Sequence, residues 1–165
     1  MRGPVEIEHK LDREISNIIR RSKLDKRFFS KRKAVSYAEF LSDRLLMILV
    51  IREGVTYSLF SLIQHLTPFS EKNWADFLDL STKSLNRYKQ SSKSFRPIQS
   101  EKIIEMAEVT KIGLDTFEDM EKFKLWLETP NFSMGSLRPI ELLKDSYGKE
   151  LVIGELTRIN YGILV

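Results

Sequence analysis

The chain of 165 residues is long enough for one globular domain or two small ones, and a hydrophobic share of 42% provides for a core. It contains no cysteine, which excludes disulfide frameworks, thiolate nucleophiles and cysteine-based zinc sites and fits a reducing compartment. No secretory signal is visible and the longest apolar run, Leu45 to Ile51, is too short to span a bilayer, so we expect a soluble, cytoplasmic protein with no membrane partner.

The net charge of +4 is unevenly distributed along the chain. Residues 1–53 carry net +5, residues 54–102 carry +3, and residues 103–165 carry −4. A basic front and an acidic back predict two surfaces with different partners. The alternative is that the asymmetry arose by chance.

The first 33 residues are polar and basic. Apolar residues at helical spacing predict an amphipathic helix over about 5–21, whose apolar stripe needs the rest of the chain or a second copy as its partner. Residues 20–33 are dense in Lys and Arg and contain Phe28 and Phe29. We favour a solvated linker here over an ordered arm that contacts phosphates, because basic runs are commonly surface.

Two apolar helices are predicted next, over about 36–51 and 56–66. Ser36 and Glu39 form a capping box at the start of the first, and Gly54 is placed to end it. After a loop at 91–99, two further helices are predicted, over 100–113 with Ser100 as N-cap and over 116–127. A loop at 130–138 precedes a helix that starts at Pro139. The last helix is predicted over 149–160, after a break at Gly148.

Residues 71–90 have the pattern of a helix-turn-helix. A short helix with an apolar inner face is followed by a break at Asp79–Leu80. Ser81 then caps a polar helix in which only Leu85 and Tyr88 look inward. A polar helix of this kind fits the major groove of DNA, where its N-terminal residues reach base edges.

The charge pattern of this second helix also favours DNA. From Leu80 to Ser100 the chain has five Lys or Arg and no acidic residue, and DNA affinity comes largely from contacts to phosphates. Arg87 can fork onto a guanine or clamp a phosphate. An ordinary surface helix is the equally weighted alternative. The predicted DNA-binding residues are Ser81, Thr82, Lys83, Ser84, Asn86, Arg87, Lys89 and Lys93.

The last third of the chain resembles the toxin-binding domain of Xre/MbcA/ParS-type antitoxins. The matching landmarks are Phe117, Trp126-Leu127, Thr129-Pro130-Asn131, Gly135, Pro139, Leu142-Leu143, Gly148, Val152, Leu156, Arg158-Ile159 and Tyr161-Gly162. Upstream, FLDLSTKSLNRYKQ is similar to the helix-turn-helix of the same family, so the resemblance covers roughly residues 50–165. Phe123, Ser136 and Asn86 depart from the family pattern.

The resemblance implies an all-α fold in which an Xre-like helix-turn-helix domain (50–99) precedes a small helical toxin-binding domain (100–165), after a basic extension (1–49). It implies the antitoxin of a type II toxin–antitoxin system, which neutralises a RES-type, NAD-consuming toxin and represses its own operon at operator DNA. It also implies a homodimer that has no cofactor and no catalysis of its own.

For toxin binding, the resemblance and the residue chemistry together indicate Trp126, Asn131, Arg158, Asn160, Tyr161, Gly162, Ile163, Leu164 and Val165. Net −4 after residue 102 would complement a cleft that holds anionic NAD phosphates. Trp126 is core or anchor, with core favoured. The tail beyond Gly162 is frayed, captured by a partner, or folded back through Tyr161 and Ile163.

Catalysis is disfavoured by the residues themselves. His9 and His65 are the only histidines and lack metal-ligand spacing. No glycine-rich phosphate loop occurs, and Glu118 and Asp119 look like helix-start charges. Two other functions remain open, namely a stand-alone helix-turn-helix regulator whose C-terminal domain dimerises or senses a ligand, and a scaffold without a nucleic-acid role.

Overall fold

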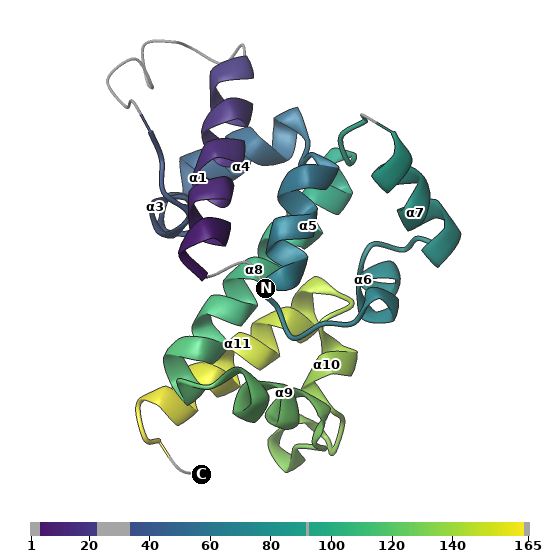
Figure 1. Cartoon of the computed structure of the whole chain (residues 1–165). Helices are drawn as coiled ribbons and strands as arrows, with labels where there is room; N and C mark the ends of the chain where they lie inside the picture. The colour runs from purple at the N-terminus through teal and green to yellow at the C-terminus, as the bar shows by residue number, and fades with distance from the viewer. Residues whose placement is uncertain (1–3, 23–33, 92, 164–165) are drawn as a thin grey trace. The chain divides into compact units, whose positions relative to one another are not determined.

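The structure, a computed structural model, describes residues 4–22, 34–91 and 93–163 (Figure 1). Within them the secondary structure is helical apart from an isolated β-bridge between Asn131 and Leu137, which confirms the predicted all-α class. No helix of this described part is long and apolar enough to cross a membrane. The predicted features at Phe28 and Phe29, most of the basic run to which they belong, and the predicted toxin contacts Leu164 and Val165 lie outside the described residues.

The chain divides into two compact units. The first unit comprises Met1–Leu66 and Thr82–Ile104, and the second comprises Thr67–Ser81 and Glu105–Val165. These units follow packing, and they differ from the predicted domains in that the helix after Ser70 belongs with the C-terminal residues. The predicted domain boundaries at 49 and 99 concern function and remain a prediction.

In the first unit the N-terminal helix finds its partners within the chain. Helix α1 (Pro4–Arg21) contacts α3 (Tyr37–Ser42), α4 (Arg44–Glu53) and α5 (Tyr57–His65) (Figure 1). The residues of its stripe that become buried are Leu11, Ile15 and Ile18. Burial of apolar area is the main favourable contribution to folding, so the stripe is used inside the unit.

The single helix predicted over 36–51 is wrong, because two helices occupy this stretch. The capping box is present as predicted, with the Ser36 N–H donating to the Glu39 carboxylate at 2.8 Å. Asp43 is extended, and its Oδ1 accepts the backbone N–H groups of Leu45 at 3.0 Å and Leu46 at 3.3 Å. Asp side chains compete for backbone donors in this way, so Asp43 ends α3 and caps α4.

Helix α8 (Pro97–Phe117) is longer than predicted at both ends. It begins at Pro97, a residue suited to the first helical position, so the predicted cap at Ser100 is wrong. Ser100 is buried inside the helix, where its hydroxyl accepts the Val55 N–H at 2.8 Å and donates to the Phe95 carbonyl at 3.2 Å. Gly113 does not end the helix. It lies inside α8, and the Phe123 ring packs against it.

The second unit contains α6 (Glu71–Phe77), α9 (Met120–Glu128), a 3-10 turn η1 (Phe132–Met134), α10 (Pro139–Leu142) and α11 (Ser146–Asn160). Helix α10 packs on both α9 and α11. Helix α11 is also tied to α8 by an ion pair of 2.8 Å between Lys149 Nζ and Glu105 Oε1, whose side chains are only 19% and 12% exposed.

Gly148 was predicted to break the chain before the last helix, which is wrong. It lies in the first turn of α11, where its N–H donates to the Asp145 carboxylate at 2.8 Å. A Cβ at this position would collide with the backbone carbonyl of Leu142. The glycine therefore permits the close packing of α11 on the end of α10.

Two glycines of α11 should respond oppositely to alanine. A methyl group at Gly154 would meet no atom within 4 Å, so Gly154→Ala should stabilise the fold by about 0.5–1 kcal/mol through helix propensity. Gly148→Ala should destabilise it by about 1–3 kcal/mol, because the methyl group overlaps the Leu142 carbonyl. Urea unfolding followed by circular dichroism measures both, and a destabilising Gly154→Ala would contradict this packing.

Candidate functional sites

Helix α7 (Thr82–Gln90) is held in the first unit by the two residues predicted to look inward. Leu85 is buried. Tyr88 stacks on Phe95 with ring centroids 4.2 Å apart, and its hydroxyl donates to the Gln99 amide oxygen at 3.3 Å. Phe95 is itself anchored, since its N–H donates to the Val55 carbonyl at 2.8 Å. These contacts leave the polar face of α7 turned to solvent.

The predicted DNA-binding residues lie on that face and at its edges. Ser81, Thr82, Lys83, Asn86, Arg87, Lys89 and Lys93 are exposed, and Ser84 is half-buried. The charged side-chain groups of the four cations among them make no hydrogen bond or ion pair with any other residue that the structure describes. The face is therefore positively charged, and its four cationic groups are available for contacts to phosphates.

Gln90 is a residue of this face that the sequence analysis missed. It is exposed and follows Lys83, Asn86 and Arg87 at helical spacing. A Gln amide can pair bidentately with an adenine edge. The helical spacing of the sequence alone is sufficient to place Gln90 on this face.

The connection between α6 and α7 is a tight turn at the predicted position. Asp79 adopts a left-handed backbone with φ 52°, a conformation that Asp tolerates better than most residues. The Leu80 N–H then donates to the Ala75 carbonyl at 2.9 Å. The two predicted helices thus form, with α6 in the second unit and α7 in the first.

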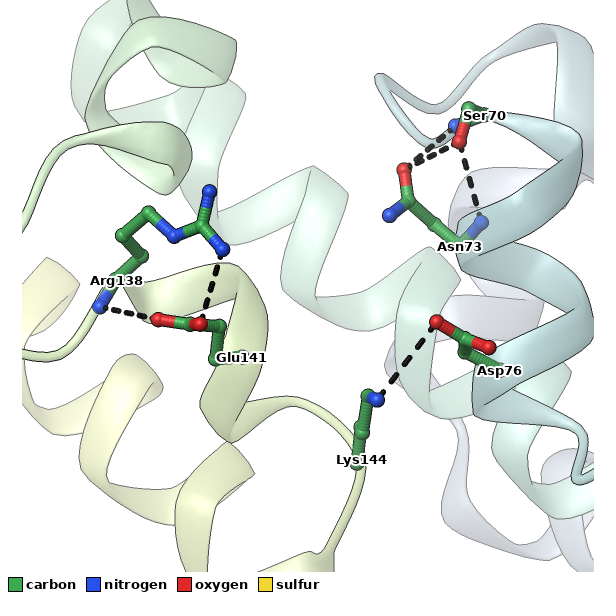
Figure 2. A network of polar contacts seen from close by, with 6 residues as sticks. All are labelled: Ser70, Asn73, Asp76, Arg138, Glu141 and Lys144. Carbon is green, nitrogen blue, oxygen red and sulfur yellow. Dashed lines mark hydrogen bonds and ion pairs between the residues drawn. The ribbon is translucent and has the colours of Figure 1, made fainter.

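The second unit has a groove of about 480 Å³ between α6 and α10, with the end of α9 beside it (Figure 2). Its lining residues are Lys72, Asn73, Asp76, Phe77, Glu128, Arg138, Ile140, Glu141 and Lys144. Three of these are basic and three are acidic, so the groove has no net preference for an anion. Lys144 reaches across it to Asp76 at 3.7 Å.

One side of this groove is ordered by Arg138 and Glu141. The Glu141 carboxylate accepts the Arg138 guanidinium at 2.9 Å and the Arg138 backbone N–H at 3.1 Å (Figure 2). The side-chain and backbone hydrogen bonds from Arg138 lower the pKa of the Glu141 carboxyl, and the same carboxylate raises the pKa of Arg138. The pair fixes the start of α10, which is a structural task.

The loop before α10 is pinned by Asn131. Its N–H donates to the Leu137 carbonyl at 3.0 Å, and its amide oxygen accepts the N–H of Ser133 at 3.0 Å. The Asn131 side chain is thus occupied in holding the loop. Its predicted contact with a toxin remains a prediction.

The same loop presents Phe132 to solvent with 93% of its surface exposed. The sequence analysis missed this residue, because nothing in the local pattern distinguishes an exposed phenylalanine from a buried one. Large aromatic side chains are frequent among the anchors of protein interfaces, so this ring is a candidate anchor.

The remaining predicted toxin contacts separate into core and surface. Trp126 is half-buried against Phe117 and Phe123, with ring centroids 5.7 and 6.3 Å away, which fits the favoured core role. The exposed ones are Arg158, Asn160, Tyr161, Gly162 and Ile163. Tyr161 and Ile163 do not fold back on the domain, so that alternative for the tail is wrong.

The described residues offer no metal centre. No cluster of three or more His, Cys, Asp or Glu side chains among them could hold an ion. The Nδ1 of His65 contacts the Ser61 carbonyl one turn back in α5, and Asp119 caps α9 by accepting the Lys122 N–H at 2.8 Å, as predicted for a helix-start charge.

Comparisons with known proteins agree with this arrangement. Residues 113–162 match a family described as the antitoxin Xre/MbcA/ParS C-terminal toxin-binding domain. The chain is also similar to a chain in the crystal structure of the M. tuberculosis MbcT–MbcA toxin–antitoxin complex, with a TM-score of 0.53 and 18% identity over 64% of this chain and 94% of that one. At this identity the likeness shows a shared fold. No curated protein matches the chain.

The helical fold and this match define the class, a helical protein that ends in a binding domain of the antitoxin type. Residues 113–162 are similar to the Xre/MbcA/ParS antitoxin C-terminal domains, which confirms the resemblance predicted from the sequence over this stretch. The family description names toxin binding and no reaction, in agreement with the prediction of a non-enzymatic chain.

Ser136, which departs from the family pattern, should be a site of backbone strain. It has φ 61°, directly after Gly135 with φ 67°. A left-handed backbone costs a residue with a Cβ about 1–2 kcal/mol, so Ser136→Gly should stabilise the domain by about 1 kcal/mol. Urea unfolding measures the change, and a lower midpoint for Ser136→Gly would contradict the loop conformation.

Proposed function

We propose that this chain is a cytoplasmic antitoxin of a type II toxin–antitoxin system, which binds and neutralises a RES-type, NAD-consuming toxin through its second unit. The family match over residues 113–162 is the observation that carries the proposal. The net charge of −4 after residue 102 supports it, because a cleft for NAD phosphates is itself positively charged.

The surface of the second unit supports a protein partner. Of the eleven large hydrophobic side chains exposed in the described residues, eight lie beyond residue 120. These are Leu125, Phe132, Leu137, Tyr147, Leu151, Ile159, Tyr161 and Ile163. Apolar surface concentrated on a small domain is typical of an interaction site. Phe132 and the exposed chain end at Gly162–Ile163 are our proposed anchors for the toxin.

We further propose that the protein represses its own operon through α7. The exposed cations of this helix provide phosphate contacts, while Asn86, Arg87 and Gln90 provide groups that read bases. A homodimer would place two copies of α7 on two half-sites, as helix-turn-helix proteins do.

Toxin binding is tested by co-expression with the product of the adjacent gene. The full chain should copurify with that product and restore growth. Phe132→Ser should raise the Kd at least about 10-fold, because it removes an exposed anchor. Lys111→Ala, at an exposed position of α8, is the matched control and should bind like the unaltered chain.

Removal of residues 162–165 should weaken neutralisation and spare DNA binding. If the full chain forms no complex and gives no rescue, the antitoxin assignment fails and a stand-alone regulator is favoured. If Phe132→Ser binds like the Lys111→Ala control, the toxin surface lies elsewhere.

DNA binding is tested with a labelled duplex from upstream of the gene, titrated at several salt concentrations. Lys83→Ala and Arg87→Ala should each weaken binding and reduce the slope of log K against log salt by about one, because each removes one phosphate-neutralising charge. Should Arg87→Ala instead cost about 1–3 kcal/mol on the specific duplex only, it contacts a base. Unchanged binding by both variants would remove α7 from the interface.

A further inference from the structure

Helix α11 exposes a continuous stripe along its whole length. The stripe, which we call the α11 seam, consists of Tyr147, Leu151, Gly154, Arg158 and Tyr161 at alternating spacings of four and three residues. Tyr147 is 83% exposed, Leu151 58% and Tyr161 74%, whereas the opposite face of α11 is buried in the second unit. Large side chains at this spacing are typical of a helix that packs against another helix.

Gly154 lies at the middle of the seam. Glycine destabilises a helix interior relative to alanine, and no described neighbour explains it here, because a Cβ would meet nothing within 4 Å. A residue without a side chain does allow the backbone of a second helix to approach closely. A second helix packed on the seam would give this glycine a structural role.

The residues around Gly154 are arranged as a self-complementary series. Tyr147 and Tyr161 lie seven residues before and after it, and Glu150 and Arg158 lie four residues before and after it. In an antiparallel helix pair that crosses at Gly154, each Glu150 faces Arg158 of the second copy, and each Tyr147 faces Tyr161 of the second copy. Arg158 also pairs with Glu155 of its own helix at 3.2 Å, so its guanidinium would lie between two carboxylates in the dimer. A two-fold symmetric contact requires this self-complementarity, whereas an unrelated partner does not.

We propose that the α11 seam is the homodimer contact of this protein, with a second copy of α11 as its occupant. On each side of the paired glycines, one Glu150–Arg158 pair and one Tyr147–Tyr161 pair would form between the two copies. One helix pair is small beside the roughly 800 Å² per partner of a stable interface, so the dimer should dissociate reversibly on dilution.

The proposal deepens the homodimer of the proposed function by assigning its contact, and it does not depend on toxin binding or on operon repression. It also takes Arg158 and Tyr161 from the predicted toxin contacts, and Tyr147 and Leu151 from the exposed apolar residues counted above for a protein partner. Phe132 and the residues from Gly162 onward then remain for the toxin.

A single cysteine tests the crossing point. The chain has no cysteine, so Gly154→Cys introduces the sole thiol, and at a two-fold crossing it lies opposite its own counterpart. Mild oxidation of the full chain should give a disulfide-linked dimer on a non-reducing gel. Lys111→Cys, at an exposed position of α8, is the control and should remain monomeric. Absence of the Gly154→Cys dimer, or equal cross-linking of both variants, would overturn the proposal.

Charge reversal tests the register by sedimentation equilibrium of the full chain. Glu150→Arg and Arg158→Glu should each raise the dimer Kd about 10-fold, because like charges then meet twice. The double variant should return to within about 3-fold of the unaltered chain, since opposite charges face each other again. Gly154→Trp should abolish the dimer while circular dichroism shows a folded protein.

Two outcomes would overturn the dimer contact without touching the antitoxin proposal. One is an unaltered chain that stays monomeric over the whole concentration range. The other is a set of seam variants that dimerise normally and lose toxin capture, which would assign the seam to the toxin. Normal dimer behaviour without any toxin complex would instead overturn the antitoxin proposal and leave the seam assignment standing.

Discussion

Burial of α8 is the constraint on which both compact units depend. From Gln99 to Thr110 nine of the twelve residues of this helix are buried, four polar ones included, so each buried polar group there needs a partner. Ser100 meets this requirement in the first unit, where it holds the Val55 and Phe95 backbone. Glu105 meets it in the second unit through Lys149. One helix thus supplies core to two units, and Ser100 and Glu105 each find a partner within the unit to which they belong.

The two candidate surfaces arise from this packing in different ways. Helix α7 contributes little to the core beyond Leu85 and the Tyr88 ring on Phe95, so its Lys and Arg side chains are left to solvent, unpaired within the described part of the chain. Helix α11 is buried along one face and exposed along the other, and the exposed face is apolar at three of its positions. A charged face suits a polyanion, and an apolar face suits a protein, so each surface follows from what its helix does not bury.

Order in the exposed parts comes from local hydrogen bonds. Asn131 closes the loop that carries Phe132, and Glu141 holds the start of the next helix through Arg138. These contacts involve solvent-exposed groups, so they fix the conformation of the loop and contribute little to the free energy of unfolding. An ordered loop loses less entropy on binding, which is the advantage of presenting an aromatic anchor in this way.

The sequence by itself determined the helical class, the capping box at Ser36, the polar face of α7 and the family of residues 113–162. The first three features depend on side chains within about four positions of one another, where spacing and chemistry are visible in the chain. The family resemblance depends on landmarks that recur in order from Phe117 to Gly162. Only the tertiary structure decided that Ser100 and Gly148 lie inside helices, that Phe132 is exposed, and that one face of α11 is left uncovered by the described residues. Each of these is settled by contact, or its absence, with residues beyond the local turn.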